Sequence, residues 1–180
     1  MLEGIMKFKS QIGVGLVEVL VALLLLSIAV LGFVALQVRA IVVSEEAAYN
    51  VQAMNLARDL SERMRMNRDG LASYKLSTSG TPKACDTTYC SPAELAVYDY
   101  TQVSNRADNE GMSLAILDCQ GIHAAFKRKC VYVAWGDTIP ADKTTQTAAS
   151  EIAAGATPCT DSTSYSPSAQ CVIVEVYNYD

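Results

Sequence analysis

The sequence predicts an α+β fold in which one long N-terminal helix packs against a C-terminal antiparallel sheet. A long apolar stretch passes directly into an amphipathic helical pattern, without a linker rich in Gly, Pro or Ser. Segments with the apolar alternation of strands follow at 113–119, 127–135 and 171–179. The length of 180 residues fits one domain with appendages.

Residues 19–36 form the apolar stretch and contain no charged side chain. As a helix they would be about 27 Å long, close to the roughly 30 Å hydrocarbon core of a bilayer. A secretory signal peptide would have a shorter apolar region and a small-residue cleavage site. We therefore expect a membrane-spanning segment that stays in the mature protein. Lys7 and Lys9 precede it and only Arg39 follows closely, which indicates a cytoplasmic N-terminus and an exported C-terminal part.

The helical pattern continues beyond the apolar stretch. Apolar residues recur at steps of three, four and seven, namely Val38, Val42, Tyr49, Ala53, Leu56, Leu60 and Met64. The sequence Asp69-Gly70 offers the first stop signal. We predict one helix over residues 14–68, about 80 Å long. The alternative is a membrane anchor, a linker and a separate domain helix.

A second helix is predicted from Pro92 to about residue 105. Ser91 and Glu94 form a capping-box pattern, with Pro92 at the first helical position. We expect this helix to present to the core Leu95, Tyr98 and either Gln102 or Val103. Residues 71–82 and 105–111 are predicted to be loops. Residues 136–170 are too weakly periodic to assign.

The charge balance argues against nucleic-acid binding. The chain has 14 basic and 19 acidic residues, a net charge of −5, whereas nucleic-acid binding needs clustered Lys and Arg. The six cysteines all lie in the part predicted to be exported. An even number of cysteines in an exported domain indicates disulfides, which persist in an oxidising periplasm.

The cysteine spacing does not favour a metal site. Cys85 and Cys90 lack the paired short spacing of a zinc site, and the chain has one histidine, His123. Six cysteines allow fifteen connectivities. We choose pairing between sequence neighbours, because two pairs would close a hairpin end and a short loop: Cys85–Cys90, Cys119–Cys130 and Cys159–Cys171.

Gly13 precedes an apolar residue, Glu18 lies five positions after it, and a long helix rich in Val, Leu and Ala follows. This pattern resembles the processing motif of type IV prepilins. Residues 18–23, 31–37 and 62–68 together resemble minor pilins of the PilV type. The resemblance covers about the first seventy residues. Val14 stands where Phe is usual, and Gly15 where Thr is more usual.

The resemblance implies a pilin-like fold and a structural subunit that primes or joins type IV pilus assembly, with roles in twitching motility and adhesion. It implies cleavage after Gly13 by a prepilin peptidase and methylation of the new Val14 amine. The chain then divides into a leader (1–13), the transmembrane and filament-core half of the helix (14–36), its amphipathic half (37–69) and a disulfide-stabilised globular domain (70–180).

Location and partners follow from the same resemblance. We expect a single-pass protein of the inner membrane with its C-terminal domain in the periplasm, which then enters the pilus at its base or tip. The expected partners are other minor pilins and the major pilin through the N-terminal helix, the prepilin peptidase, a tip adhesin, and membrane lipid before assembly.

Glu18 is the strongest candidate functional residue, because a carboxylate at the start of an apolar helix is costly without a partner. Its natural partner is the amine of a cleaved Val14 on the same or a neighbouring subunit. The alternative is that Glu18 lies in the lipid headgroup zone. Arg63, Arg65 and Arg68 are candidate partner contacts. Arg58 and Glu62 are expected to form a solvated ion pair.

The remaining candidates are weaker. His123 is interpreted as a solvated turn residue rather than a general base, and packing explains most of the aromatic residues Tyr98, Tyr132, Trp135, Tyr165, Tyr177 and Tyr179. We expect no catalytic, cofactor or metal site. A minor pseudopilin of a type II secretion system is the first alternative function. A membrane-anchored periplasmic enzyme or ligand-binding domain is the second, and no paired carboxylates, triad or cofactor loop favours it.

Overall fold

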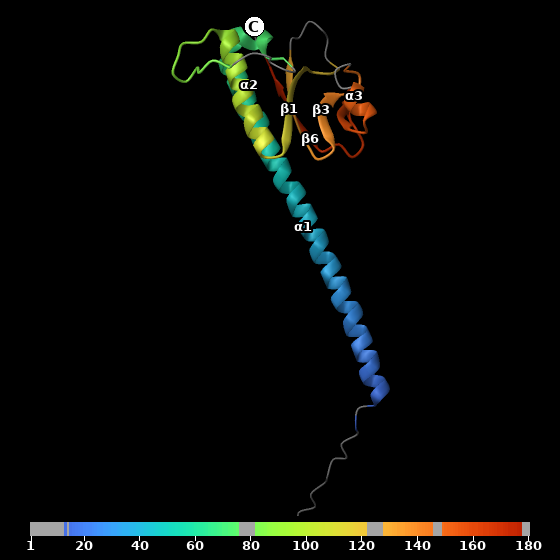
Figure 1. Ribbon diagram of the computed structural model, residues 1–180. Helices are drawn as coiled ribbons and strands as arrows, with labels where there is room; N and C mark the ends of the chain where they lie inside the picture. The colour runs from blue at the N-terminus through green and yellow to red at the C-terminus, as the bar shows by residue number, and fades with distance from the viewer. Residues whose placement is uncertain (1–12, 14, 76–81, 122–127, 146–148, 178–180) are drawn as a thin grey trace, which may run out of the picture. The chain divides into compact units, whose positions relative to one another are not determined.

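The computed structural model describes residues 13, 15–75, 82–121, 128–145 and 149–177 (Figure 1). The chain divides into two compact units, Met1–Glu45 and Glu46–Asp180. Helix α1, Leu16–Met66, begins in the first unit and ends in the second. Its C-terminal part packs on an antiparallel sheet, so the predicted α+β, pilin-like arrangement is confirmed. The predicted leader up to residue 12, and Val14, lie outside the described residues.

Within the first unit, α1 is a helix with an exposed apolar surface. It contains an 18-residue window of mean hydropathy 3.0. By length and composition, this helix can cross a membrane. Val38 and Val42 belong to this exposed part.

Within the second unit, the predicted helical periodicity places the core residues correctly. Ala53, Leu56, Leu60 and Met64 are buried in the main hydrophobic core. Tyr49 is half-exposed, and its ring stacks on Trp135 with the centroids 6.3 Å apart.

Helix α1 ends two residues earlier than predicted. Asn67 leaves the helical conformation, with φ −105° and ψ 60°, and the 3₁₀-helix η1 follows over Arg68–Ser73. The predicted loop at 71–82 is therefore wrong for its first three residues. Gly70 and Leu71, both buried, hold this turn against the core.

Helix α2, Pro92–Asn109, begins with the predicted capping box. Ser91 N donates to Glu94 Oε2 at 2.8 Å, and Glu94 N donates to Ser91 Oγ at 3.4 Å. The predicted end near 105 and the polar turn at 105–111 are wrong. The polar residues there are mostly the solvent-facing side of a helix that continues to Asn109, and Gly111 follows with φ +72°.

The buried face of α2 also differs from the prediction. It consists of Ala96, Asp99, Val103 and Ala107. Of the side chains expected in the core, only Val103 is buried there, whereas Leu95 and Tyr98 are half-buried and Gln102 is exposed. Sequence periodicity favoured the larger apolar residues, but α2 packs close to its neighbours through small alanines and a buried aspartate.

The first sheet has three antiparallel strands in the order β1-β2-β6: β1 is Met112–Asp118, β2 is Lys129–Trp135 and β6 is Cys171–Val176. Central strand β2 is buried on both faces. Val131, Val133 and Trp135 pack in the core with α1 and α2, whereas Cys130 and Tyr132 belong to a second apolar cluster. Lys127 and residues 178–179, predicted as strand ends, lie outside the described residues.

A second small sheet, in the order β3-β4-β5, occupies the region left unassigned from sequence (Figure 1). Strand β3, Thr138–Asp142, pairs in parallel with β4, Thr157–Asp161, and β4 pairs antiparallel with β5, Ser164–Tyr165. Helix α3, Ala149–Ala153, lies in the connection between the two parallel strands. The parallel pair was not predicted, because these strands are short and rich in Thr.

Three disulfides fasten the second unit. Cys85–Cys90 closes the loop before α2, Cys119–Cys130 joins the end of β1 to β2, and Cys159–Cys171 joins β4 to β6. The last bond therefore ties the small sheet to the three-stranded sheet.

Candidate functional site

The N-terminal end of α1 carries the residues singled out by the sequence motif. Gly13 and Gly15 precede the helix, and Glu18 lies in its first turn. Glu18 N donates to Gly15 O at 2.9 Å, so the helical ladder starts at Gly15. The Glu18 side chain is exposed, and a carboxylate in the first turn is favoured by the helix dipole. Since Val14 lies outside the described residues, its contact with Glu18 stays a prediction.

An exposed apolar surface extends along α1 in the first unit, and Glu18 lies near its N-terminal end. The exposed large hydrophobic residues extend from Leu16 to Val43 along α1. Soluble monomers rarely expose a continuous apolar surface of this size. The part of α1 in the first unit is therefore suited to contact lipid or other apolar helices. Glu18 is an acidic group at one end of this part.

The arginines near the end of α1 differ in what they do. Arg63 Nε contacts Asp59 Oδ1 at 2.9 Å, and Arg63 Nη1 contacts Asp99 Oδ1 at 3.2 Å. Hydrogen bonding to Asp59 outweighs burial and raises the pKa of Arg63, with a further contribution from Asp99. Arg106 Nη1 binds the other Asp59 oxygen at 2.8 Å. Arg63 thus fastens α1 to α2. Its contact with a partner stays a prediction.

Arg65 and Arg68 remain exposed. Arg65 Nη1 lies 3.4 Å from Glu62 Oε1. The expected pair between Arg58 and Glu62 is thus replaced by a pair between Glu62 and Arg65. Both side chains are largely exposed, so this pair contributes little to stability.

A buried polar cluster joins α1, η1 and α2. Tyr74 Oη donates to Asp99 Oδ2 at 2.8 Å, and Asn67 Nδ2 donates to Pro92 O at 2.8 Å and to Tyr74 Oη at 3.3 Å. Burial raises the pKa of Tyr74 far above its usual value, and Asp99 adds to this. A Cβ at Gly70 would lie 2.4 Å from both Asn67 Nδ2 and Pro92 O, so only glycine fits there.

Sequence reasoning missed Asn67, Tyr74 and Asp99. For Asn67 and Asp99 the available signal was a polar residue at a helical step from predicted core positions, whereas Tyr74 lies in a segment without periodicity. Each group needs a hydrogen-bond partner when buried, and here each supplies a partner for another.

The other sequence candidates differ in burial. His123 and Tyr179 are outside the described residues. Tyr132 and Trp135 are buried, Tyr98 is half-buried, and Tyr165 and Tyr177 are exposed. Among the described residues, no group of three or more His, Cys, Asp or Glu is arranged to hold a metal ion.

Residues 35–101 match a family model described as type IV pilin Tt1218, Tt1218-like. The matched segment begins in the apolar stretch and ends within α2, so it contains Arg63 and the buried cluster of Asn67, Tyr74 and Asp99. This similarity supports a place in the type IV pilin superfamily and a structural role as a pilin. It also agrees with membrane anchoring by the apolar helix. Comparisons with curated proteins and with solved structures found no match.

Proposed function

We propose that this chain is a minor pilin of the PilV type, a structural subunit that primes or joins the assembly of a type IV pilus. The observation that carries the proposal is the exposed apolar helix surface with Glu18 in its first turn, on a helix that continues into the pilin-like segment 35–101. An apolar helix of this kind suits two environments in turn, the bilayer and a bundle of other pilin helices.

Assembly in this proposal starts with removal of residues 1–13 by a prepilin peptidase. The new Val14 amine is methylated and remains positively charged. Glu18 neutralises such an amine when apolar helices come together without water. Residues 14–36 then enter the filament core, while residues 37–69 support the globular domain, 70–180, on the periplasmic side and later on the pilus.

Processing at Gly13 is the first test. Gly13→Arg places a long cationic side chain at the cleavage position, so cells with a prepilin peptidase should leave its leader attached. The wild-type chain should yield a mature N-terminus at Val14. N-terminal sequencing and intact mass of purified protein measure both results. Ser10→Arg, the same new side chain within the leader, is the matched control and should be cleaved. A wild-type protein that keeps its leader contradicts the proposal.

A deletion strain separates the pilus role from a role in type II secretion. We expect loss of twitching motility with secretion of extracellular proteins intact. Complementation with the wild-type chain should restore twitching. Loss of secretion with normal twitching would instead assign the chain to the pseudopilins.

A further inference from the structure

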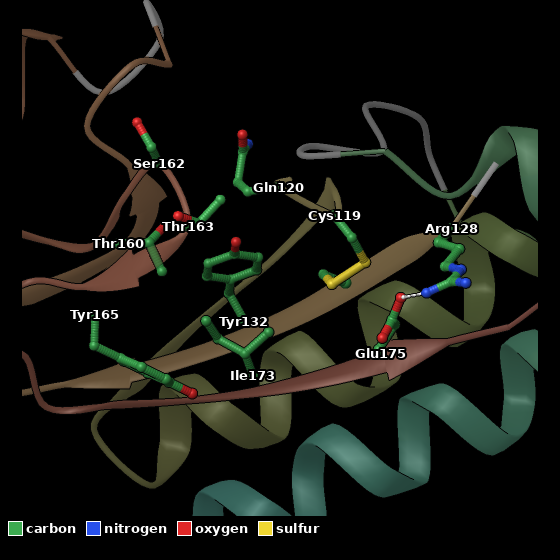
Figure 2. A pocket seen from close by; sticks show the side chains of 11 residues that line it. Cys119, Gln120, Arg128, Tyr132, Thr160, Ser162, Thr163, Tyr165, Ile173 and Glu175 are labelled. Atoms are coloured by element: carbon green, nitrogen blue, oxygen red, sulfur yellow. Dashed lines mark hydrogen bonds and ion pairs between the residues drawn. A yellow bond between two sulfur atoms is a disulfide. The ribbon is translucent and has the colours of Figure 1, made fainter. Parts of the chain in front are cut away.

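A pocket of about 270 Å³ with a mixed polar and apolar lining opens on the second unit, on the side of β2 that carries Tyr132 (Figure 2). Tyr132 lies in its middle, next to Ile173 of β6. The turn after β4 provides one wall, and the end of β1 with the Cys119–Cys130 disulfide provides another.

The walls of the pocket are held in place before any ligand arrives. A Cβ at Gly121 would lie 2.7 Å from Thr163 Cγ2, so glycine allows the chain after β1 to approach the turn after β4. That turn is a tight hairpin in which Thr160 pairs with Tyr165. Cys159–Cys171 ties β4 to β6 beneath it. A rigid site loses little conformational entropy on binding, which favours affinity for a small ligand.

The charged groups in the pocket neutralise each other. Arg128 Nη1 lies 2.9 Å from Glu175 Oε1, and both side chains are about one-third exposed, at 32% and 28%. The Arg128 guanidinium also lies over the Tyr177 ring, 4.6 Å from its centroid. The paired groups therefore offer hydrogen-bond donors and acceptors with no excess charge, which disfavours a strongly anionic ligand.

The rest of the accessible lining combines hydroxyls, an amide and an aromatic ring. Ser162, Thr163 and Gln120 are exposed, and Tyr165 is 57% exposed. Figure 2 shows Tyr165 at one end of the pocket and the Arg128–Glu175 pair at the other. An apolar ring face, several neutral polar groups and a paired charge match the surface of a sugar, which has a C–H face and a rim of hydroxyls.

We propose that this pocket binds a neutral saccharide, one or two rings in size. The volume is just below the range of about 300–1,000 Å³ that is typical of ligand pockets, so a longer glycan would enter only with its end. Tyr165 packs on the C–H face of the ring, and Arg128, Glu175 and Gln120 exchange hydrogen bonds with its hydroxyls. The subunit thereby gains a sugar-binding activity in addition to assembly.

The test uses the full-length chain, purified in a detergent without a sugar headgroup so that the detergent does not compete. Saturation-transfer NMR measures binding of two panels of neutral probes. One panel holds galactose-, glucose- and mannose-ended disaccharides, and the other holds N-acetylglucosamine oligomers, which represent bacterial envelope sugars. Sialyllactose is the anionic comparison. We expect saturable binding in one panel and at least tenfold weaker binding of sialyllactose.

Two pocket variants and one control variant connect binding to the pocket. Tyr165→Ala removes the exposed ring and should weaken binding at least tenfold, whereas Tyr89→Ala, at a tyrosine that is 88% exposed outside the pocket, should leave it unchanged. Glu175→Gln removes the negative charge beside Arg128 and should shift preference toward sialyllactose. Absence of saturable binding in both panels, or unchanged binding by Tyr165→Ala, overturns the proposal.

Discussion

Tyr74 Oη donates a 2.8 Å hydrogen bond to Asp99 Oδ2, while Arg63 binds the other oxygen of the same carboxylate at 3.2 Å. The Asp99 residue is only 6% exposed, and both of its carboxylate oxygens have partners. Asp99 lies in α2, Tyr74 lies just after η1, and Arg63 lies in α1. This contact therefore joins the end of α1 to α2 and η1, in addition to the apolar packing of α1 in the core.

Tyr74→Phe tests this contact. The substitution keeps the ring but leaves Asp99 Oδ2 without its donor and Asn67 Nδ2 without one acceptor. A buried polar group that loses its partner costs about 1–3 kcal/mol, so the free energy of unfolding should fall by that amount. Urea unfolding of the full-length chain in detergent measures it. Tyr89→Phe makes the same change at an exposed tyrosine and should have no effect. Equal stability of the two variants would contradict the structural role.

Asp142 predicts how stability depends on pH. The residue is fully buried, and burial alone would raise its pKa. Hydrogen bonds outweigh burial and lower the pKa of Asp142: Thr144 donates through its backbone N at 2.9 Å and through its hydroxyl, and Thr160 Oγ1 donates at 2.8 Å. The folded state therefore binds this proton less readily than the unfolded state does.

Because the folded pKa is lowered, the stabilisation from Asp142 is present above the unfolded pKa of about 4 and is lost as pH falls through the folded pKa. We expect Asp142→Asn to lower the free energy of unfolding by about 1–3 kcal/mol at pH 7, with a smaller difference from wild type at pH 3. Urea unfolding at both pH values measures this. Asp137→Asn, at an exposed aspartate before β3, is the control. A difference that grows toward acid pH would refute the assignment.

The elements with a strong periodic signal were the ones that sequence could predict. Ala53, Leu56, Leu60 and Met64 recur at helical steps because one side of α1 meets the core. The alternation of β2 likewise separates its two buried faces. The capping box at Ser91 gave the start of α2, because that signal consists of local hydrogen bonds.

The parts that sequence could not predict depend on contacts between distant residues. The parallel pair of β3 and β4 is stabilised by partners far apart in the chain, and short Thr-rich strands carry little periodicity. The buried face of α2 was misplaced because Asp99 is satisfied by Tyr74 and Arg63, which no local pattern reveals. At the N-terminal site the motif supplied Gly13, Val14 and Glu18. The proposed contact of Glu18 with the Val14 amine would form only in a cleaved chain, within the same or a neighbouring subunit.

The disulfide pairs give a chemical prediction. We expect no free thiols in protein purified from the periplasmic side, and the bonds Cys85–Cys90, Cys119–Cys130 and Cys159–Cys171. Alkylation without reduction counts the thiols, and mass spectrometry of unreduced peptides maps the bonds. Chymotrypsin cuts after Tyr89 and Tyr165, and trypsin cuts between residues 127 and 129, so each bond joins two separate peptides.

Replacing Cys119 and Cys130 together by serine tests what one of these bonds contributes. A disulfide that closes a loop of this size stabilises a protein by about 3 kcal/mol, so the free energy of unfolding should fall by that order. Bridges between members of different pairs would contradict the connectivity, and free thiols in the wild type would contradict the oxidation.

Glu18 gives the prediction that separates assembly from processing. Glu18→Ala should leave the leader cleaved but keep the subunit in the inner membrane, because an unpaired Val14 amine buried among apolar helices costs several kcal/mol. Glu18→Gln keeps the size and loses the charge, so it should fail nearly as completely. Glu18→Asp keeps the charge on a shorter side chain and should retain part of the assembly. Immunoblots of the sheared pilus fraction and the membrane fraction measure each variant, with N-terminal sequencing to confirm cleavage. A carboxylate solvated among lipid headgroups would let all three variants enter pili, so Glu18→Ala protein in pili at the wild-type level would refute charge pairing for this subunit.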